Sequence, residues 1–283
     1  MPTLLLILTT IFFGLSFILT KSALQEIPPL SFIFFRFLCA NIFLLPSIIH
    51  LRGKVKKEDI RRGAQLGVLL GGVIFLQTIG LQTITVSASA FLTGFAIVFV
   101  LAIRCVVQKQ APSFLALVAT STCMTGLGLV TQSQGLSWDP GVYYTLGCAF
   151  FLALYIYTLA TYAGHSQALV LTLLQITVIT LLAGLAALSL EGKIHIPTQA
   201  NTWWATLGCG IICTALCSWA RAYAQQHLSA LQGAMISTLE PVSATMFAWL
   251  FSGEVLSFSF YIGAAMILGA IGLINWLLQG PEA

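Results

Sequence analysis

The stretch from Leu228 to Phe251 reads LSALQGAMISTLEPVSATMFAWLF, an apolar run with a single carboxylate, Glu240, near its middle. A run of this length is sufficient to cross the hydrocarbon core of a bilayer. A charged carboxylate at that depth costs about 3 kcal/mol or more, so such residues usually mark a substrate or proton pathway. The adjacent Pro241 lacks a backbone donor and favours a kink. The stretch predicts a membrane helix with a functional acid; the alternative interpretation of Glu240 is a protonated or hydrogen-bonded packing residue.

The composition extends this interpretation to the whole chain. Of 283 residues, 58% are hydrophobic and 7% are charged, whereas soluble domains carry about 25% charged residues. We therefore expect an all-α membrane protein whose first segment is a span rather than a signal peptide. Ten transmembrane helices are predicted, approximately at 3–20, 31–50, 64–82, 86–106, 113–131, 141–162, 168–190, 203–223, 229–251 and 258–278.

Basic residues set the expected orientation, because loops rich in Lys and Arg stay in the cytoplasm. If the N-terminus is cytoplasmic, two basic residues, Lys21 and Lys193, lie at the outer side. Nine lie on or near the inner side: Arg52, Lys54, Lys56, Lys57, Arg61, Arg62, Arg104, Lys109 and Arg221. We expect a multi-pass protein of the inner (cytoplasmic) membrane with both termini in the cytoplasm and the lipid bilayer as its surroundings. The net charge of +4 gives no indication of nucleic-acid binding.

Two pairs of segments indicate an internal repeat. The segment beginning Thr85-Val86-Ser87-Ala88 and the segment His227-Leu228-Ser229-Ala230 are related by an offset of 142, measured between Ser87 and Ser229. The end of the fifth expected helix, Gly126-Leu127-Gly128-Leu129-Val130, matches Ala270-Ile271-Gly272-Leu273-Ile274 within the tenth at an offset of 144. Each half, 1–137 and 138–283, would hold five helices. Because five is odd, the halves would be inverted, a common plan for secondary transporters with a site between the halves.

Short motifs in both halves of the chain give it a family resemblance. The motifs are Phe13-Gly14-Leu15-Ser16-Phe17, Lys21, Pro28-Pro29 and Arg36 in the first half, and Leu239-Glu240-Pro241-Val242 and Gly253-Glu254 in the second. With these motifs the chain resembles the EamA-type carriers of the drug/metabolite transporter superfamily, with Phe13 at the position of the family's tryptophan. The resemblance implies a ten-helix inner-membrane carrier, often an exporter of amino acids or related metabolites. It also makes Lys21 a candidate gate residue; the alternative interpretation of Lys21 is an ordinary lysine at the membrane interface.

The first half departs from the family pattern. Val98-Phe99 corresponds to Glu240-Pro241, and Ala111-Pro112 corresponds to Gly253-Glu254. The first half therefore lacks the family's usual proline and acid, and a symmetric coupling mechanism is not implied.

Polar side chains within the expected spans are candidates for a binding site, because small-molecule sites combine apolar walls with a few converging polar groups. Each has an alternative role as a hydrogen bond between helices. The preferred candidates beside Glu240 and Arg36 are Gln77, Gln175, Trp219, Ser237 and Thr238, and Gln82, Ser89 and Thr93 are further polar groups.

Arg36 and Glu240 are expected at similar depth. Counted at 1.5 Å per residue, Arg36 lies roughly 9 Å from the outside and Glu240 roughly 16 Å from the inside of a core about 30 Å thick. They would pair or bracket a zwitterion, Arg36 taking a carboxylate and Glu240 an ammonium. The alternative is that Arg36 extends to the outer headgroups.

A secondary carrier working by alternating access explains these features together. Its expected partners are a small-molecule substrate and, through Glu240, protons. The alternatives are a channel or scaffold and, less in keeping with the residues, a membrane-embedded enzyme, since neither a catalytic pair nor an ATP-binding loop is found. We expect no cofactor and no metal, because Cys209, Cys213 and Cys217 are read as small packing residues. The oligomeric state is not indicated.

Overall fold

The computed structural model describes residues 2–47, 55–131, 139–252 and 258–277, and its regular elements within those ranges are helices. The elements are α1 (Pro2–Ala23), α2 (Pro29–Leu44), α4 (Lys57–Gly80), α5 (Val86–Gly94), α6 (Ala96–Gln108), α7 (Phe114–Thr131), α8 (Pro140–Ala163), α9 (Ala168–Leu190), α10 (Ala200–Gly208), the π-helix η1 (Cys209–Leu216), α11 (Cys217–Gln225), α12 (Ala230–Ser237), α13 (Leu239–Ser252) and α14 (Phe258–Leu277).

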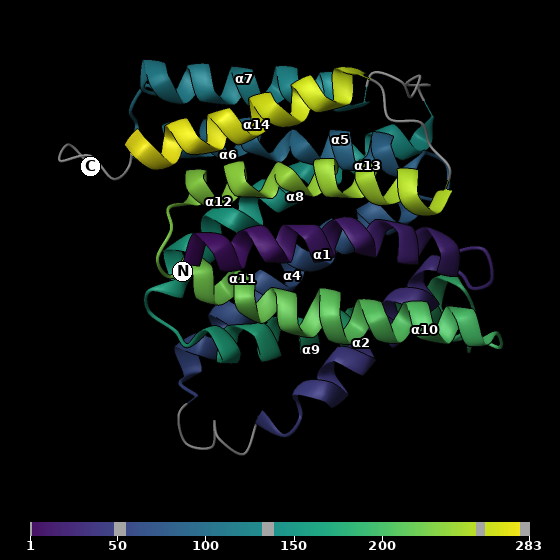
Figure 1. The fold of residues 1–283 in the computed structure, drawn as a ribbon. Coiled ribbons are helices and arrows are strands. Elements are labelled where there is room, and N and C mark those ends of the chain that lie inside the picture. Colours follow the sequence, from purple (N-terminus) through teal and green to yellow (C-terminus); the bar gives the residue numbers. More distant parts are fainter. Residues whose placement is uncertain (1, 48–54, 132–138, 253–257, 278–283) are drawn as a thin grey trace.

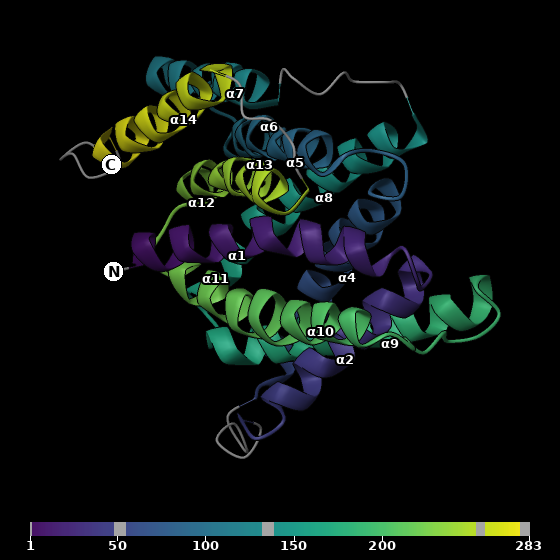
Figure 2. The same ribbon diagram turned by 45° about the vertical axis from the view of Figure 1, so that its right-hand side comes forward.

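The helices lie side by side as one bundle (Figure 1), and a second view shows the same arrangement with α7 and α14 together at one edge (Figure 2). Among the described residues, eight helical segments are long and apolar enough to cross a membrane: 2–23, 29–47, 57–80, 86–108, 140–163, 168–190, 200–225 and 230–251. The other two expected spans coincide with α7 and α14, whose apolar parts are shorter. The chain is thus an all-helical, multi-pass membrane protein, and the count of ten spans stays a prediction.

Hydrogen bonds between helix ends show that successive long helices alternate in direction. The ammonium of Lys21, at the end of α1, donates to the carbonyls of Leu81 and Ile84 just beyond the end of α4. Gln226, at the end of α11, donates to the carbonyls of Ala163 and Ser166 at the end of α8, at 2.9 and 3.1 Å. α1 begins and α14 ends at the same side of the molecule (left in Figure 1).

A carboxylate fixes the loop between α9 and α10 to the end of α1. Glu26 accepts hydrogen bonds from the backbone of Thr198 and Gln199, at 2.5 and 3.0 Å. Hydrogen bonds from the hydroxyls of Thr202 and Thr198 lower the pKa of Glu26 to about 2. An ionised carboxylate at this place also suits the positive N-terminal end of α10.

Helices from the two halves of the chain are interleaved rather than packed as two separate bundles. α1 packs on α13, α11 and α10, and the second-half helix α8 packs on α4, α5 and α6. α2 packs on α9, and α7 on α14. Close approach is possible where glycine faces a neighbour: a Cβ on Gly14 would lie 2.6 Å from Cβ of Ser243 on α13. Likewise, a Cβ on Gly67 would lie 2.7 Å from Cβ of Val178 on α9.

Two of the long segments are broken near their middles. The expected span 229–251 divides into α12 and α13 at Thr238, and the expected continuous span 86–106 divides into α5 and α6 at Phe95. Pro241 explains the first break, because its ring excludes the helical hydrogen bond to the carbonyl four residues earlier, that of Ser237. The second break corrects the expectation of one continuous helix. It follows Gly94, a residue that costs about 1 kcal/mol in a helix relative to alanine.

Candidate functional site

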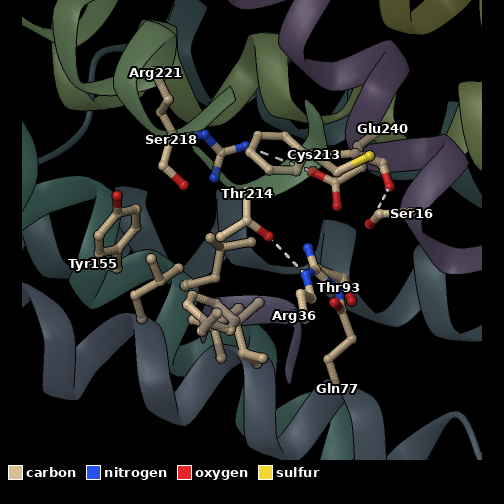
Figure 3. Close-up of a pocket in the computed structure, with 16 residues that line it drawn as sticks. Ser16, Arg36, Gln77, Thr93, Tyr155, Cys213, Thr214, Ser218, Arg221 and Glu240 are labelled. Carbon is tan, nitrogen blue, oxygen red and sulfur yellow. Dashed lines mark hydrogen bonds and ion pairs between the residues drawn. The ribbon is translucent and has the colours of Figure 1, made fainter. Parts of the chain in front are cut away.

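A central cavity with a volume of about 40 Å³ lies where α1, α2, α4, α5, α8, η1, α11 and α13 converge. Its wall combines apolar and polar groups, as small-molecule sites do. The lining residues are Phe13, Ser16, Arg36, Phe37, Leu70, Val73, Ile74, Gln77, Thr93, Leu152, Tyr155, Cys213, Thr214, Ser218, Arg221 and Glu240. Figure 3 shows the polar members of this set around one space.

An ion pair connects α11 with α13 across the cavity. Nη2 of Arg221 lies 3.6 Å from Oε2 of Glu240, and the two residues are 6% and 8% exposed. Glu240 is placed by the first turn of α13, immediately after the break at Thr238. The aromatic ring of Phe13 covers Arg221, with 4.3 Å from Cζ to the ring centroid, a cation–π geometry. Arg221 is therefore held by an acid at one edge and a ring on one face.

Arg36 faces the same cavity but is not the ion-pair partner of Glu240. It is 4% exposed, and its Nε donates to Oγ1 of Thr214 at 2.7 Å. The expected Arg36–Glu240 pair is thus corrected: among the described residues, the ion-pair partner of Glu240 is Arg221. The alternative, extension of Arg36 to the outer headgroups, is also not observed, because the side chain is buried against η1.

The π-helix η1 positions the partner of Arg36. Its Gly210 lies so close to α2 that a Cβ there would be 2.7 Å from the carbonyl oxygen of Arg36. This close crossing brings Thr214, one turn further along η1, to the guanidinium. Single π turns inside α-helices are rare and often occur at functional sites. The element expected as one regular helix at 203–223 is therefore an α–π–α segment.

A second, smaller cavity of about 10 Å³ lies between the two broken helices. It is lined by the residues around both breaks, including Gly94 and Ala96 on one side and Ser237, Thr238 and Glu240 on the other. Glu240 and Thr93 belong to both cavities. Ser237 and Thr238 therefore lie beside Glu240, although each hydroxyl donates to a backbone carbonyl of its own helix, those of Gly233 and Met235.

The remaining candidates are distributed differently. Gln77 lines the central cavity. Gln175 is fully buried one layer behind it, where its Oε1 accepts a hydrogen bond of 3.2 Å from the hydroxyl of Tyr155, a lining residue. Trp219 does not line either cavity; it is 38% exposed and stacks on Tyr223 along α11. Gln82 lies beyond the end of α4 and is exposed.

Sequence reasoning missed Arg221, which it placed near the cytoplasmic surface. Arg221 lies four residues before the end of α11, so a depth count puts its Cα near the membrane boundary. Side chains in a helix tilt toward the helix N-terminus, however, and the N-terminal end of α11 points to the bundle centre. The long side chain therefore reaches back to Glu240. The sequence did contain a signal for this role, because Arg221 lies within an expected membrane span. Charged residues inside membrane spans usually mark substrate or ion pathways.

The cysteines pack as small apolar residues. Cys209, Cys213 and Cys217 are buried, and Cys213 lines the central cavity. Within the described ranges, no group of three or more His, Cys, Asp or Glu residues is arranged to hold a metal ion.

Comparison with known proteins places this geometry in context. A model of the EamA-like transporter family matches residues 1–132 and again 139–276. An uncharacterized transporter from Archaeoglobus fulgidus is 25% identical over 276 residues, which cover 95% of this chain and 84% of the relative. A crystal structure has a similar fold, with a TM-score of 0.78, 14% identity and 99% of each chain aligned.

Proposed function

The chain belongs to the EamA-like transporter family, and from this premise we propose that it is a secondary carrier exporting small metabolites such as amino acids or their derivatives across the cytoplasmic membrane. The observation that carries the proposal is the buried cavity in which Arg36, Arg221 and Glu240 meet. Charges of both signs at such depth are costly, and they typically mark a substrate or ion pathway.

The proposed architecture is ten transmembrane helices in two inverted five-helix repeats, 1–137 and 138–283. Equivalent features recur at similar spacing in support of it. The side chains of Thr85 and Ser229 cap α5 and α12 and are 144 residues apart, and the breaks at Phe95 and Thr238 are 143 apart. The packing also has corresponding pairs: α1 on α11 matches α8 on α4, and α1 on α13 matches α8 on α6. The family model matches each half separately.

We take alternating access as the transport mechanism, and we propose that the moving bodies are two mixed groups of helices in place of the two halves of the sequence. Because α1 packs with α10–α13 while α8 packs with α4–α6, the natural units are these two mixed groups of helices. The ion pair Arg221–Glu240 lies within the first group, and the central cavity lies between the groups. Relative rocking of the groups would expose the cavity to each side in turn.

Glu240 is proposed as the residue that carries a coupling proton or contacts the ammonium group of a substrate, with Arg36 taking a carboxylate. Gln77, Ser237 and Thr238 supply neutral polar groups nearby. Gln175 is proposed to position Tyr155, which lines the cavity, through their hydrogen bond. Trp219, which is partly exposed, is proposed to face the lipid.

The proposed orientation in the membrane rests on the loop charges. Without Arg221, which lies in the cavity, eight basic residues still fall on the proposed cytoplasmic side against Lys21 and Lys193 outside. Two of the eight, Arg52 and Lys54, lie outside the described residues. The excess supports cytoplasmic termini.

Flux into proteoliposomes tests the function. Purified protein is reconstituted and offered a panel of labelled amino acids, with and without an imposed pH gradient. We expect uptake that saturates with concentration and responds to the gradient. Gradient-independent exchange would retain the carrier and reassign Glu240 to substrate binding or packing. Uptake that rises linearly with concentration would contradict a carrier and favour a channel.

A further inference from the structure

The central cavity carries a surplus of positive charge. Among its lining residues, Arg36, Arg221 and Glu240 are the side chains of the Lys, Arg, Asp and Glu types, which gives two positive charges and one negative charge. All three are at least nine-tenths buried. Because a buried charge without a counter-charge is strongly unfavourable, the surplus creates a place for an anion.

The donors of Arg221 are available to such an anion. Its Nε and Nη2 atoms are buried and have no hydrogen-bond partner in the structure. The contact of Nη2 with Glu240, at 3.6 Å, is an ion pair but too long for a hydrogen bond. Phe13 covers one face of the guanidinium and leaves its edge, where the N–H donors lie, to the cavity. A planar fork of donors with a fixed plane is suited to a carboxylate, which it binds through two parallel hydrogen bonds.

Arg36 provides a second cation oriented to the same space. Its hydrogen bond from Nε to Thr214 fixes the guanidinium against η1. Figure 3 shows the Arg36 and Arg221 groups entering the cavity from different sides, with Glu240 beside them. An anionic group in this space would lie near both arginines, with Glu240 beside it.

Resting on the proposed function, and narrowing its substrate class, we propose that Arg36 and Arg221 form a carboxylate clamp and that the cavity selects solutes with one net negative charge. A neutral zwitterion would leave the positive surplus in place, whereas a monoanion cancels it. The favoured class is therefore amino acids with an acidic side chain, in which Glu240 faces the ammonium group and the clamp binds a carboxylate. On binding, Arg221 exchanges its long contact with Glu240 for direct hydrogen bonds to the substrate.

Two pairs of ligands with nearly equal shape and different charge test the clamp: L-glutamate against L-glutamine, and L-aspartate against L-asparagine. Binding to the purified, full-length protein is measured by calorimetry, and saturable flux by reconstitution. We expect each acid to bind at least about tenfold more tightly than its amide, the effect of one charge-assisted hydrogen bond. The variant Arg221→Gln should reduce this ratio to near one. The matched control Arg61→Gln, at an exposed arginine paired with Glu58, should leave the ratio unchanged.

The outcomes separate this inference from the proposed function. Saturable transport of the amides as well as the acids, with equal affinity, would overturn the clamp and leave the carrier intact. A ratio that persists in Arg221→Gln would also overturn it, provided the variant keeps the thermal stability of the native protein. Absence of saturable flux for all four ligands in native, folded protein would contradict the acidic amino-acid class and count against the amino-acid function itself.

Discussion

At the scale of single residues, the cavity depends on how Glu240 is balanced between two arginines. Its partner Arg221 is 3.6 Å away, and Arg36 shares the cavity while bonded to Thr214. Removing one member of a buried ion pair typically costs 3–5 kcal/mol, because the other charge is left without a partner. The same loosely bonded pair can separate when a substrate or a proton replaces one member.

Glu240→Gln tests the coupling role. The amide keeps the shape of the side chain but cannot carry a proton or balance Arg221. We expect counterflow exchange of labelled substrate to persist and transport driven by an imposed pH gradient to be lost. The two activities are measured in the same proteoliposome preparation. Equal loss of exchange and gradient-driven flux in folded protein would contradict the coupling role and leave Glu240 only its contact with the substrate's ammonium group.

Phe13→Leu tests the ring over Arg221. Cation–π contacts are worth about 0.5–2 kcal/mol, so removal of the ring should weaken substrate affinity by about 2- to 30-fold. Phe13→Trp should retain or strengthen binding, since tryptophan is the best partner for a cation. Phe12→Leu, at the exposed neighbouring residue, is the matched control. Equal affinity in Phe13→Leu and Phe12→Leu would show that the ring does not position Arg221.

At the scale of elements, two side chains tie helix ends together at opposite faces of the bundle. Lys21 of α1 holds the end of α4, and Gln226, which follows α11, holds the end of α8. Each contact joins one mixed group of helices to the other. They are therefore placed to keep the cavity closed at each face.

Lys21→Met and Gln226→Leu should open opposite faces. We expect Lys21→Met to increase labelling of Cys213, retained as the single cysteine, by an impermeant thiol reagent added outside. Gln226→Leu should increase labelling from inside. Lys193→Met, an exposed lysine near the same outer loops, is the control for lost charge. If neither variant increased labelling of Cys213 on its expected side, or if both increased labelling equally on both sides, these contacts would not close the cavity.

Gly14 sets the crossing of α1 and α13. A methyl group there would meet the side chain and backbone of Ser243 and the backbone nitrogen of Ala244 at 2.6–2.9 Å. Gly14→Ala should therefore destabilise the protein by about 1–3 kcal/mol, the usual effect of overpacking. The matched control is Gly272→Ala, where a Cβ meets nothing within 4 Å. Thermal unfolding in detergent measures both, and an equal melting temperature for the two variants would rule out a tight crossing.

Sequence patterns predicted the long helices well because hydrophobicity and length directly reflect the bilayer. The position of Glu240 beside a break was predictable from Pro241. The break at Phe95 was not predictable, because no proline lies near it and the internal repeat does not by itself indicate where a helix ends. The π turn of η1 depends on packing against α2 at Gly210, and the direction of Arg221 depends on side-chain tilt. Such features arise from tertiary contacts that linear spacing does not encode.

At the scale of the whole molecule, the helices of the two halves are interleaved, and the central cavity is therefore lined by residues from both halves. Residues from α1, α2 and α4 meet residues from α8, α11 and α13 around it. Two groups that share a central cavity, joined by Lys21 at one face and by Gln226 at the other, can rock without breaking the long packed contacts within each group. This arrangement accounts for a carrier better than for a permanently open pore.

The most direct measurement of the central claim is counterflow of labelled L-glutamate in proteoliposomes preloaded with unlabelled L-glutamate, for the native chain, Arg221→Gln and Arg61→Gln. We predict transient, saturable accumulation of label for the native protein and for Arg61→Gln, and its loss in folded Arg221→Gln. Undiminished counterflow in Arg221→Gln would contradict the claim that this cavity is the transport site.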